Sequence, residues 1–70
     1  MSWMKSVYSS NVSEVGYDDE TQELLVRWNS GKTSAYKGVT EEQAFECSQA
    51  ASVGQYLNSE IKPNFSHRYR

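Results

Sequence analysis

The chain has 70 residues, which is the size of one small domain. Its 37% apolar and 23% charged residues are typical of a globular domain rather than a disordered chain, and no apolar run approaches the ~20 residues of a membrane span. The net charge of −2 argues against a protein that covers a long nucleic-acid backbone, because such proteins are usually basic.

The single cysteine and the start of the chain both favour a cytoplasmic protein. Cys47 has no second cysteine with which to form an internal disulfide or a cysteine metal cluster, as expected in a reducing compartment. Residues 1–5 are not followed by the apolar stretch of a secretory signal. Because so small a core is marginally stable, we expect a homo-oligomer, with a monomer as the alternative.

The first half of the chain has the pattern of a β-meander. Strands are predicted at residues 12–17, 23–28 and 32–36, with a turn at 18–21 and a hairpin loop at 29–31. The clearest alternation places Leu24, Val26 and Trp28 on one side of the middle strand. Gly31 suits the left-handed backbone that a hairpin loop needs. Residues 1–9 are expected to be a leader or an edge strand.

The second half has the spacing of two short helices. Thr40 and Gln43 form a capping box at a helix start, in which the side chain of each residue accepts a hydrogen bond from the backbone N–H of the other. A second cap begins at Ser52, and Pro63 ends the second helix. The expected inner face of the first helix, which runs to about Ala50, consists of Ala44, Phe45 and Ser48, and that of the second consists of Val53, Tyr56, Leu57 and Ile61.

Apolar residues thus recur with the two-residue period of strands in the first half and with the 3.6-residue period of helices in the second. This predicts an α+β domain, because a strand face and a helix face can pack on one another. The expected fold is a three-stranded antiparallel β-meander packed with two short α-helices, in one domain over residues 1–70. The predicted core consists of Leu24, Val26, Trp28, Phe45, Leu57 and Ile61. Truncation of Phe45 to alanine is therefore predicted to cost about 3–5 kcal/mol.

Charge is distributed unevenly along the chain. Acidic side chains gather in residues 14–23, whereas residues 62–70 form a basic tail that holds Lys62, His67, Arg68 and Arg70 and no acid. A slightly acidic chain with a basic tail fits a compact anionic ligand better than a long polyanion, and it leaves RNA binding open.

Several short motifs follow one another along most of the chain. They are Ser9-Ser10-Asn11-Val12, Gly16-Tyr17-Asp18, Leu24-x-Val26-x-Trp28, Gly31, Tyr36-x-Gly38-Val39 and Ser52-x-Gly54-x-Tyr56-x-Asn58-x-x-Ile61. Together they resemble the KTSC domain, a module at the C-terminus of some lysyl-tRNA synthetases that also occurs alone in bacteria and their viruses. The family pattern has a Tyr-x-Tyr pair on the third strand, and here Ser34 replaces its first tyrosine. The resemblance implies RNA binding as a suggested function.

No set of residues for catalysis is evident. His67 is the only histidine and Cys47 the only cysteine, so a nucleophilic triad or a zinc site lacks members. The acidic run 18–20 fits a solvated turn better than an acid–base pair. We expect no enzymatic activity, no cofactor and no metal, so that cyclic nucleotides and RNA incubated with the protein are recovered intact.

Eight residues are candidates for ligand binding. They are Ser10, Asn11, Tyr36, Lys37, Asn58, Lys62, Arg68 and Arg70. Arginine can grip a phosphate bidentately, lysine can meet another phosphate, and a tyrosine can stack on a base. Six of them also have a purely structural interpretation: Tyr36 as a core residue, Ser10, Asn11 and Asn58 as caps of strands or turns, and the two arginines as solvated tail residues.

Three functions remain open from the sequence. The first is non-catalytic capture of a small anionic nucleotide-type ligand, in the form of a phage sponge that sequesters a cyclic or modified nucleotide signal of host immunity. The second is an RNA-binding module, and the third is a protein-interaction module that uses a sheet edge or a helix face.

Overall fold

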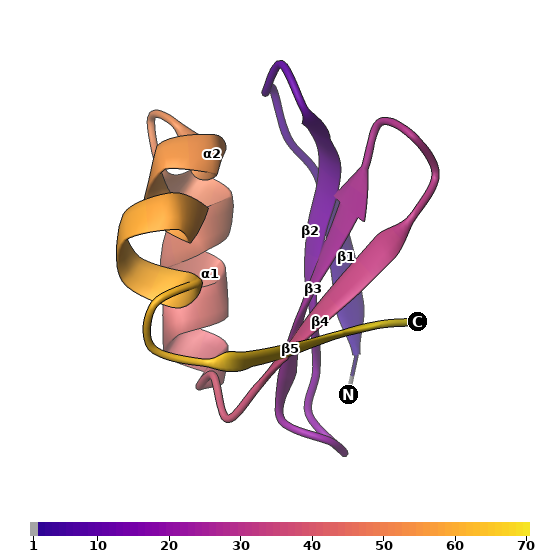
Figure 1. Cartoon of the computed structure of the whole chain (residues 1–70), viewed down its shortest axis with the longest axis vertical. Helices are drawn as coiled ribbons and strands as arrows, with labels where there is room; N and C mark the ends of the chain where they lie inside the picture. Colours follow the sequence, from indigo (N-terminus) through magenta and orange to yellow (C-terminus); the bar gives the residue numbers. More distant parts are fainter. Residues whose placement is uncertain (1) are drawn as a thin grey trace.

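The computed structural model describes residues 2–70, which form a five-stranded antiparallel sheet with one helical layer against it (Figure 1). The strands lie in chain order, and they are β1 (Trp3–Ser6), β2 (Val12–Asp18), β3 (Glu23–Trp28), β4 (Thr33–Lys37) and β5 (Ser66–Tyr69). The helical layer comprises α1 (Glu41–Gln49), α2 (Val53–Tyr56) and the π-helical turn η1 (Leu57–Ile61). The sheet face that meets the helices is called the inner face, and the opposite one the outer face.

The α+β class and the two short helices are confirmed, but the prediction of three strands is wrong because the described chain forms five. β1 lies within residues 1–9 and β5 within the predicted tail 62–70. Each of these edge strands has four residues, and nearly all of their side chains are exposed. Without a buried face, neither segment carries the apolar alternation by which a strand is recognised in a sequence.

A β-bulge explains the imperfect pattern of the first predicted strand. The register between β2 and β3 pairs Val12 with Trp28 and Glu14 with Arg27, so Ser13 is an extra residue on β2. An extra residue shifts the alternation by one position. Val12 and Val15 are consequently both buried, although their spacing of three does not fit a regular strand.

The predicted capping box at the start of α1 is present. The hydroxyl of Thr40 accepts a hydrogen bond from the backbone N–H of Gln43 at 3.2 Å, and the Gln43 side chain accepts one from the Thr40 N–H at 3.1 Å. Two of the four N–H groups that a helix start leaves without partners are thereby satisfied. No helix within residues 2–70 is long and apolar enough to cross a membrane.

We expect Thr40→Ala to lower the free energy of unfolding by about 1 kcal/mol, which is the typical cost of losing an N-cap. Thr40→Ser keeps the hydroxyl and should cost little. Urea denaturation of the two variants measures the difference. Equal midpoints for both variants would show that the cap is not needed to start α1.

The core lies between the inner face of the sheet and the helical layer. Four of the six predicted core residues, Leu24, Val26, Leu57 and Ile61, are fully buried, and Trp28 packs half-buried against them. The other buried members of the cluster are Val12, Val15, Tyr17, Tyr36, Val39, Ala44, Cys47 and Val53. The core thus joins β2, β3 and β4 to all three helical segments.

The prediction that Phe45 belongs to the core is wrong. Its side chain is 54% exposed and lies beneath the Lys5 ammonium, which is 5.6 Å from the ring centroid. The buried stripe of α1 is instead Ala44, Cys47 and Ser48. These positions follow the three- and four-residue spacing of one helix face, and Phe45 falls one residue outside it.

Candidate functional site

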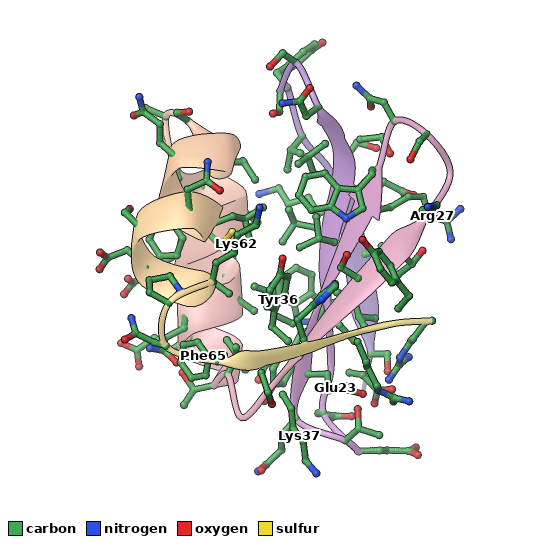
Figure 2. The ribbon with its side chains drawn as sticks, viewed as in Figure 1. Glu23, Arg27, Tyr36, Lys37, Lys62 and Phe65 are labelled. Atoms are coloured by element: carbon green, nitrogen blue, oxygen red, sulfur yellow. The ribbon has the colours of Figure 1, made fainter. Side chains whose placement is uncertain are left out.

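β5 divides the last residues of the chain between the two faces of the sheet. It pairs with β4 so that His67 lies beside Tyr36 and Arg68 beside Ala35. Tyr36 belongs to the buried core on the inner face. Because successive side chains of a strand point to opposite faces, His67 and Tyr69 lie on the inner face and Arg68 on the outer face. Figure 2 shows Tyr36 on the helix side of the sheet and Glu23 with Arg27 on the other side.

On the outer face, Glu23 accepts hydrogen bonds from two arginines. The Nε and Nη2 atoms of Arg68 each donate to its carboxylate at 2.8 Å, and Nη2 of Arg70 donates at 2.8 Å both to Glu23 and to Asp18. We call these four residues the ion cluster. Glu23 is only 2% exposed. The Arg68 guanidinium holds the pKa of Glu23 far below its usual range, and Arg70 lowers the pKa of Asp18.

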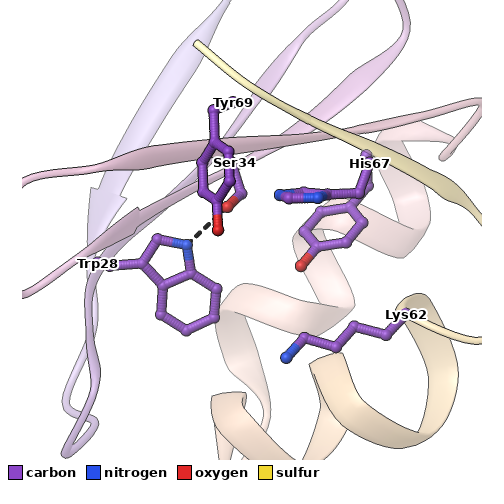
Figure 3. A pocket seen from close by; sticks show the side chains of 6 residues that line it. Trp28, Ser34, Lys62, His67 and Tyr69 are labelled. Carbon is purple, nitrogen blue, oxygen red and sulfur yellow. Dashed lines mark hydrogen bonds between the residues drawn. The ribbon is translucent and has the colours of Figure 1, made fainter.

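On the inner face, a pocket of about 340 Å³ opens between the sheet and the end of the helical layer (Figure 3). We call it the aromatic pocket. Its lining residues are Trp28, Ser34, Tyr36, Lys62, His67 and Tyr69. They come from the end of β3, from β4, from β5 and from the residue after η1. Among the described residues, none of those that line this pocket is acidic.

Three rings of the aromatic pocket, those of Tyr36, His67 and Tyr69, form a chain of contacts. The centroids of Tyr36 and His67 are 5.1 Å apart in a tilted arrangement, and those of His67 and Tyr69 are 4.7 Å apart, edge to face. The indole Nε1 of Trp28 donates to the Ser34 hydroxyl at 2.7 Å, which fixes the indole orientation. Such rings offer π-faces and edges to a flat ligand.

Two lysines bring positive charge to these rings. The Lys62 ammonium lies 5.7 Å from the centroid of the Trp28 ring, and Figure 3 shows its side chain extending across the pocket toward the indole. The Lys32 ammonium lies 5.5 Å from the Tyr69 centroid. The arrangement can therefore hold a flat ring and, beside it, an anionic group.

The sequence model of the KTSC domain family matches residues 8–65 of this chain. The chain belongs to the KTSC domain family. This KTSC domain is 36% identical over 62 residues to a protein from Tsukamurella paurometabola, with 89% of this chain and 92% of the relative covered. It is 32% identical over 65 residues to a protein from Stutzerimonas stutzeri, with 93% and 92% covered.

A solved structure shares the fold of this KTSC domain. The crystal structure of a KTSC domain protein from Yersinia pestis superposes with a TM-score of 0.87 at 27% identity, and the match covers 100% of this chain and 99% of that one. The family model ends at residue 65, before β5 begins. Two walls of the aromatic pocket, His67 and Tyr69, therefore lie beyond the segment that the family model matches.

Of the predicted ligand-binding residues, the aromatic pocket brings together Tyr36 and Lys62. Tyr36 is only 3% exposed, so it forms the floor of the pocket and offers no free ring face on which a base could stack. Burial raises the pKa of Tyr36 above its usual value, so the phenol stays neutral at physiological pH. The rings with accessible surface are the half-buried Trp28 and the exposed His67 and Tyr69.

The other predicted residues lie elsewhere. Lys37 and Arg68 line a hollow of about 450 Å³ on the outer face together with Thr21 and Glu23, and Arg70 belongs to the ion cluster. The tail itself holds no acid, but the fold brings Asp18 and Glu23 to its arginines. Asn11 lines a third hollow, and the backbone carbonyl of Ser10 accepts a hydrogen bond from Asn29, which lines the same hollow. Asn58 is exposed on η1.

Four lining residues were not among the predicted site residues: Trp28, Ser34, His67 and Tyr69. Trp28 was expected in the core, and His67 was noted only as a member of the basic tail. The alternation of His67 and Tyr69 with Arg68 and Arg70 is a signal of period two that favours a short strand. This alternation is only four residues long, which is too short to identify a strand from the sequence alone. The strand becomes evident only in the structure, where the segment pairs with the edge of β4.

Neither Cys47 nor a carboxylate is among the described residues that line the aromatic pocket. Cys47 is fully buried, and burial raises the pKa of its thiol to about 11, so it is protonated at neutral pH. Within residues 2–70, no three His, Cys, Asp or Glu side chains are placed to hold a metal ion. What the pocket offers is binding surface, made of rings, a hydroxyl and an ammonium group.

Proposed function

We propose that this KTSC domain binds a small anionic nucleotide-type ligand in the aromatic pocket and releases it unchanged. The observation that carries the proposal is the lining, in which aromatic rings and Lys62 are combined without an acidic residue. A base would lie against Trp28, His67 or Tyr69, and a phosphate would meet Lys62. The volume of about 340 Å³ is within the range of small-ligand sites, which starts at ~300 Å³.

The site differs from the one that the sequence suggested. Arg68 and Arg70 donate to carboxylates, so a phosphate would have to displace Glu23 or Asp18 to reach them. Within residues 2–70, Lys62 and Lys32 lie against aromatic rings and form no ion pair with a carboxylate. They are the better sources of positive charge for a bound anion.

The strength of these contacts bears on oligomerisation. One stacked base contributes about 1–3 kcal/mol and one charged hydrogen bond to phosphate about 1.5–3 kcal/mol. These contacts give at best a dissociation constant of tens of micromolar, because 1 μM requires about 8.2 kcal/mol. Tighter capture, as a sponge requires, needs a second copy of the chain to close over the ligand, and this supports the proposal of a homo-oligomer.

Calorimetric titration with the four nucleoside 5′-monophosphates tests the proposal. We expect at least one to bind at a fixed stoichiometry, and Lys62→Ala to weaken it about tenfold through loss of the phosphate contact. Lys37→Ala is the matched control, because Lys37 is an exposed lysine on the outer face. No binding by any of the four, or equal effects of the two variants, would contradict the proposal.

Salt dependence separates this function from RNA binding. A small ligand releases few counterions, so its affinity should change little between two salt concentrations, whereas RNA that contacts many phosphates shows a steep decrease. Native mass spectrometry of protein purified from cells reports the assembly state and any bound nucleotide together. A recovered nucleotide that is chemically intact supports capture without turnover, which a phage sponge against host nucleotide signalling requires.

A further inference from the structure

Trp28 takes part in two hollows of the inner side of the domain. It lines the aromatic pocket, and it also lines a second hollow of about 340 Å³ with Asn11, Asn29 and Ser30. We call the second one the amide hollow. Trp28 is therefore a residue that the linings of the two hollows share. Its Nε1 is bonded to Ser34 on the side of the aromatic pocket, so its orientation is fixed independently of the amide hollow.

The amide hollow has a rigid frame. The backbone N–H of Asn29 donates to the carbonyl of Asn11 at 2.9 Å, and Nδ2 of Asn29 donates to the carbonyl of Ser10 at 2.9 Å. These bonds hold the loop before β2 against the loop after β3. They leave the Asn29 Oδ1 atom as an acceptor, and the side-chain amide of Asn11 makes no hydrogen bond within residues 2–70.

The chemistry of the amide hollow differs from that of the aromatic pocket. Among the described residues, its lining carries no charge, and it combines two asparagines and a serine with Trp28. Neutral amides pair with groups that present a donor beside an acceptor, and asparagine pairs in this way with adenine. The hollow therefore suits the edge of a base and not a phosphate.

We propose that the amide hollow is a second base subsite, so that the preferred ligand is a dinucleotide whose two bases both contact Trp28, one in each hollow. This inference rests on the proposed function, because the first base and the phosphate group occupy the aromatic pocket and Lys62. The Asn11 amide reads the edge of the second base, with a preference for adenine. Each of the two hollows has a volume of about 340 Å³.

The test compares adenosine 5′-monophosphate with the linear dinucleotide pApA by calorimetry on the full chain. We expect pApA to bind about tenfold more tightly than the mononucleotide, since its second base adds hydrogen bonds to the Asn11 amide. Asn11→Ala should bring the affinity for pApA close to that for the mononucleotide and leave the mononucleotide unaffected. Asn58→Ala is the matched control, because Asn58 is an exposed asparagine that lines neither hollow.

The outcomes separate this inference from the proposed function. If the mononucleotide binds and pApA binds no more tightly, or if Asn11→Ala leaves the gain intact, the second subsite is refuted while the proposed function stands. If neither ligand binds, both fail. If affinity continues to rise from pApA to a five-residue oligoadenylate with a steep salt dependence, the site follows an RNA strand, and the dinucleotide assignment is refuted. Asn11 contributes only its backbone to the frame, so its variant is expected to fold, and circular dichroism verifies this.

Discussion

Leu57→Ala is expected to lower the free energy of unfolding by about 2–5 kcal/mol, whereas Phe45→Ala should lower it by less than about 1 kcal/mol. Leu57 is fully buried at the start of η1, and its truncation leaves a cavity between the helical layer and the sheet. Phe45 is half-exposed on α1, so it loses little more than its contact with the Lys5 ammonium. This ranking reverses the expectation that the sequence alone suggests for Phe45.

Urea denaturation followed by tryptophan fluorescence measures both variants, and an unchanged slope would show that only stability differs. The pair is matched, because each variant removes a large apolar side chain from the helical layer. If Phe45→Ala were as damaging as Leu57→Ala, α1 would have to present a different face to the sheet in solution.

The wrong prediction that Phe45 belongs to the core shows a limit of what the helical spacing of apolar residues can indicate. On α1 the spacing alone allows several adjacent stripes, and the largest apolar residue was assumed to point inward. The structure instead buries the small residues Ala44, Cys47 and Ser48, which let the helix lie close to the sheet. In β3 the period of two was sufficient to place Leu24 and Val26 together on the core side, although Leu25 on the opposite side is buried as well.

The helix start at Thr40 and the turn at Asp18 could be predicted because their stabilising contacts are local in sequence. The capping box joins residues three apart, and the Asp18 carboxylate accepts from the N–H groups of Glu20 and Thr21. The aromatic pocket and the ion cluster could not be predicted in this way. Glu23 and Arg68 are 45 positions apart, and only the pairing of β5 with β4 brings them together.

Loss of the Glu23 charge is expected to detach β5 from the sheet. β5 is a short exposed edge strand, and Glu23 binds two arginines on its outer side. Removing one member of a buried ion pair costs about 3–5 kcal/mol, and here solvent around Arg68, which is 60% exposed, reduces the effect to about 2 kcal/mol. Because His67 and Tyr69 belong to the same strand, the ion cluster on the outer face positions one wall of the aromatic pocket on the inner face.

Hydrogen exchange of the Arg70 amide measures this detachment, since its N–H donates to the Thr33 carbonyl at 2.8 Å. In Glu23→Gln we expect exchange to be about 30-fold faster, which corresponds to about 2 kcal/mol. Glu14→Gln is the control, because Glu14 forms a more exposed ion pair with Arg27 at 3.3 Å and should have little effect. Equal protection of the Arg70 amide in both variants would contradict an anchoring role of Glu23.

The attachment of β5 should also depend on pH in a defined direction. The pKa values of Glu23 and Asp18 are lowered in the folded chain, mainly by Arg68 and Arg70 respectively, and both rise when β5 detaches, that of Glu23 toward the ordinary value of a glutamate at about 4.3. The detached state then binds more protons, so acid favours it: the stabilisation is complete above about pH 5 and is lost as the pH falls below about 4.3. Protection of the Arg70 amide should fall over this range in the wild type, and Glu23→Gln should remove most of the dependence. A wild-type strand equally protected at pH 3 and pH 7 would show that the backbone ladder to β4, and not the ion cluster, holds β5 and the pocket wall in place.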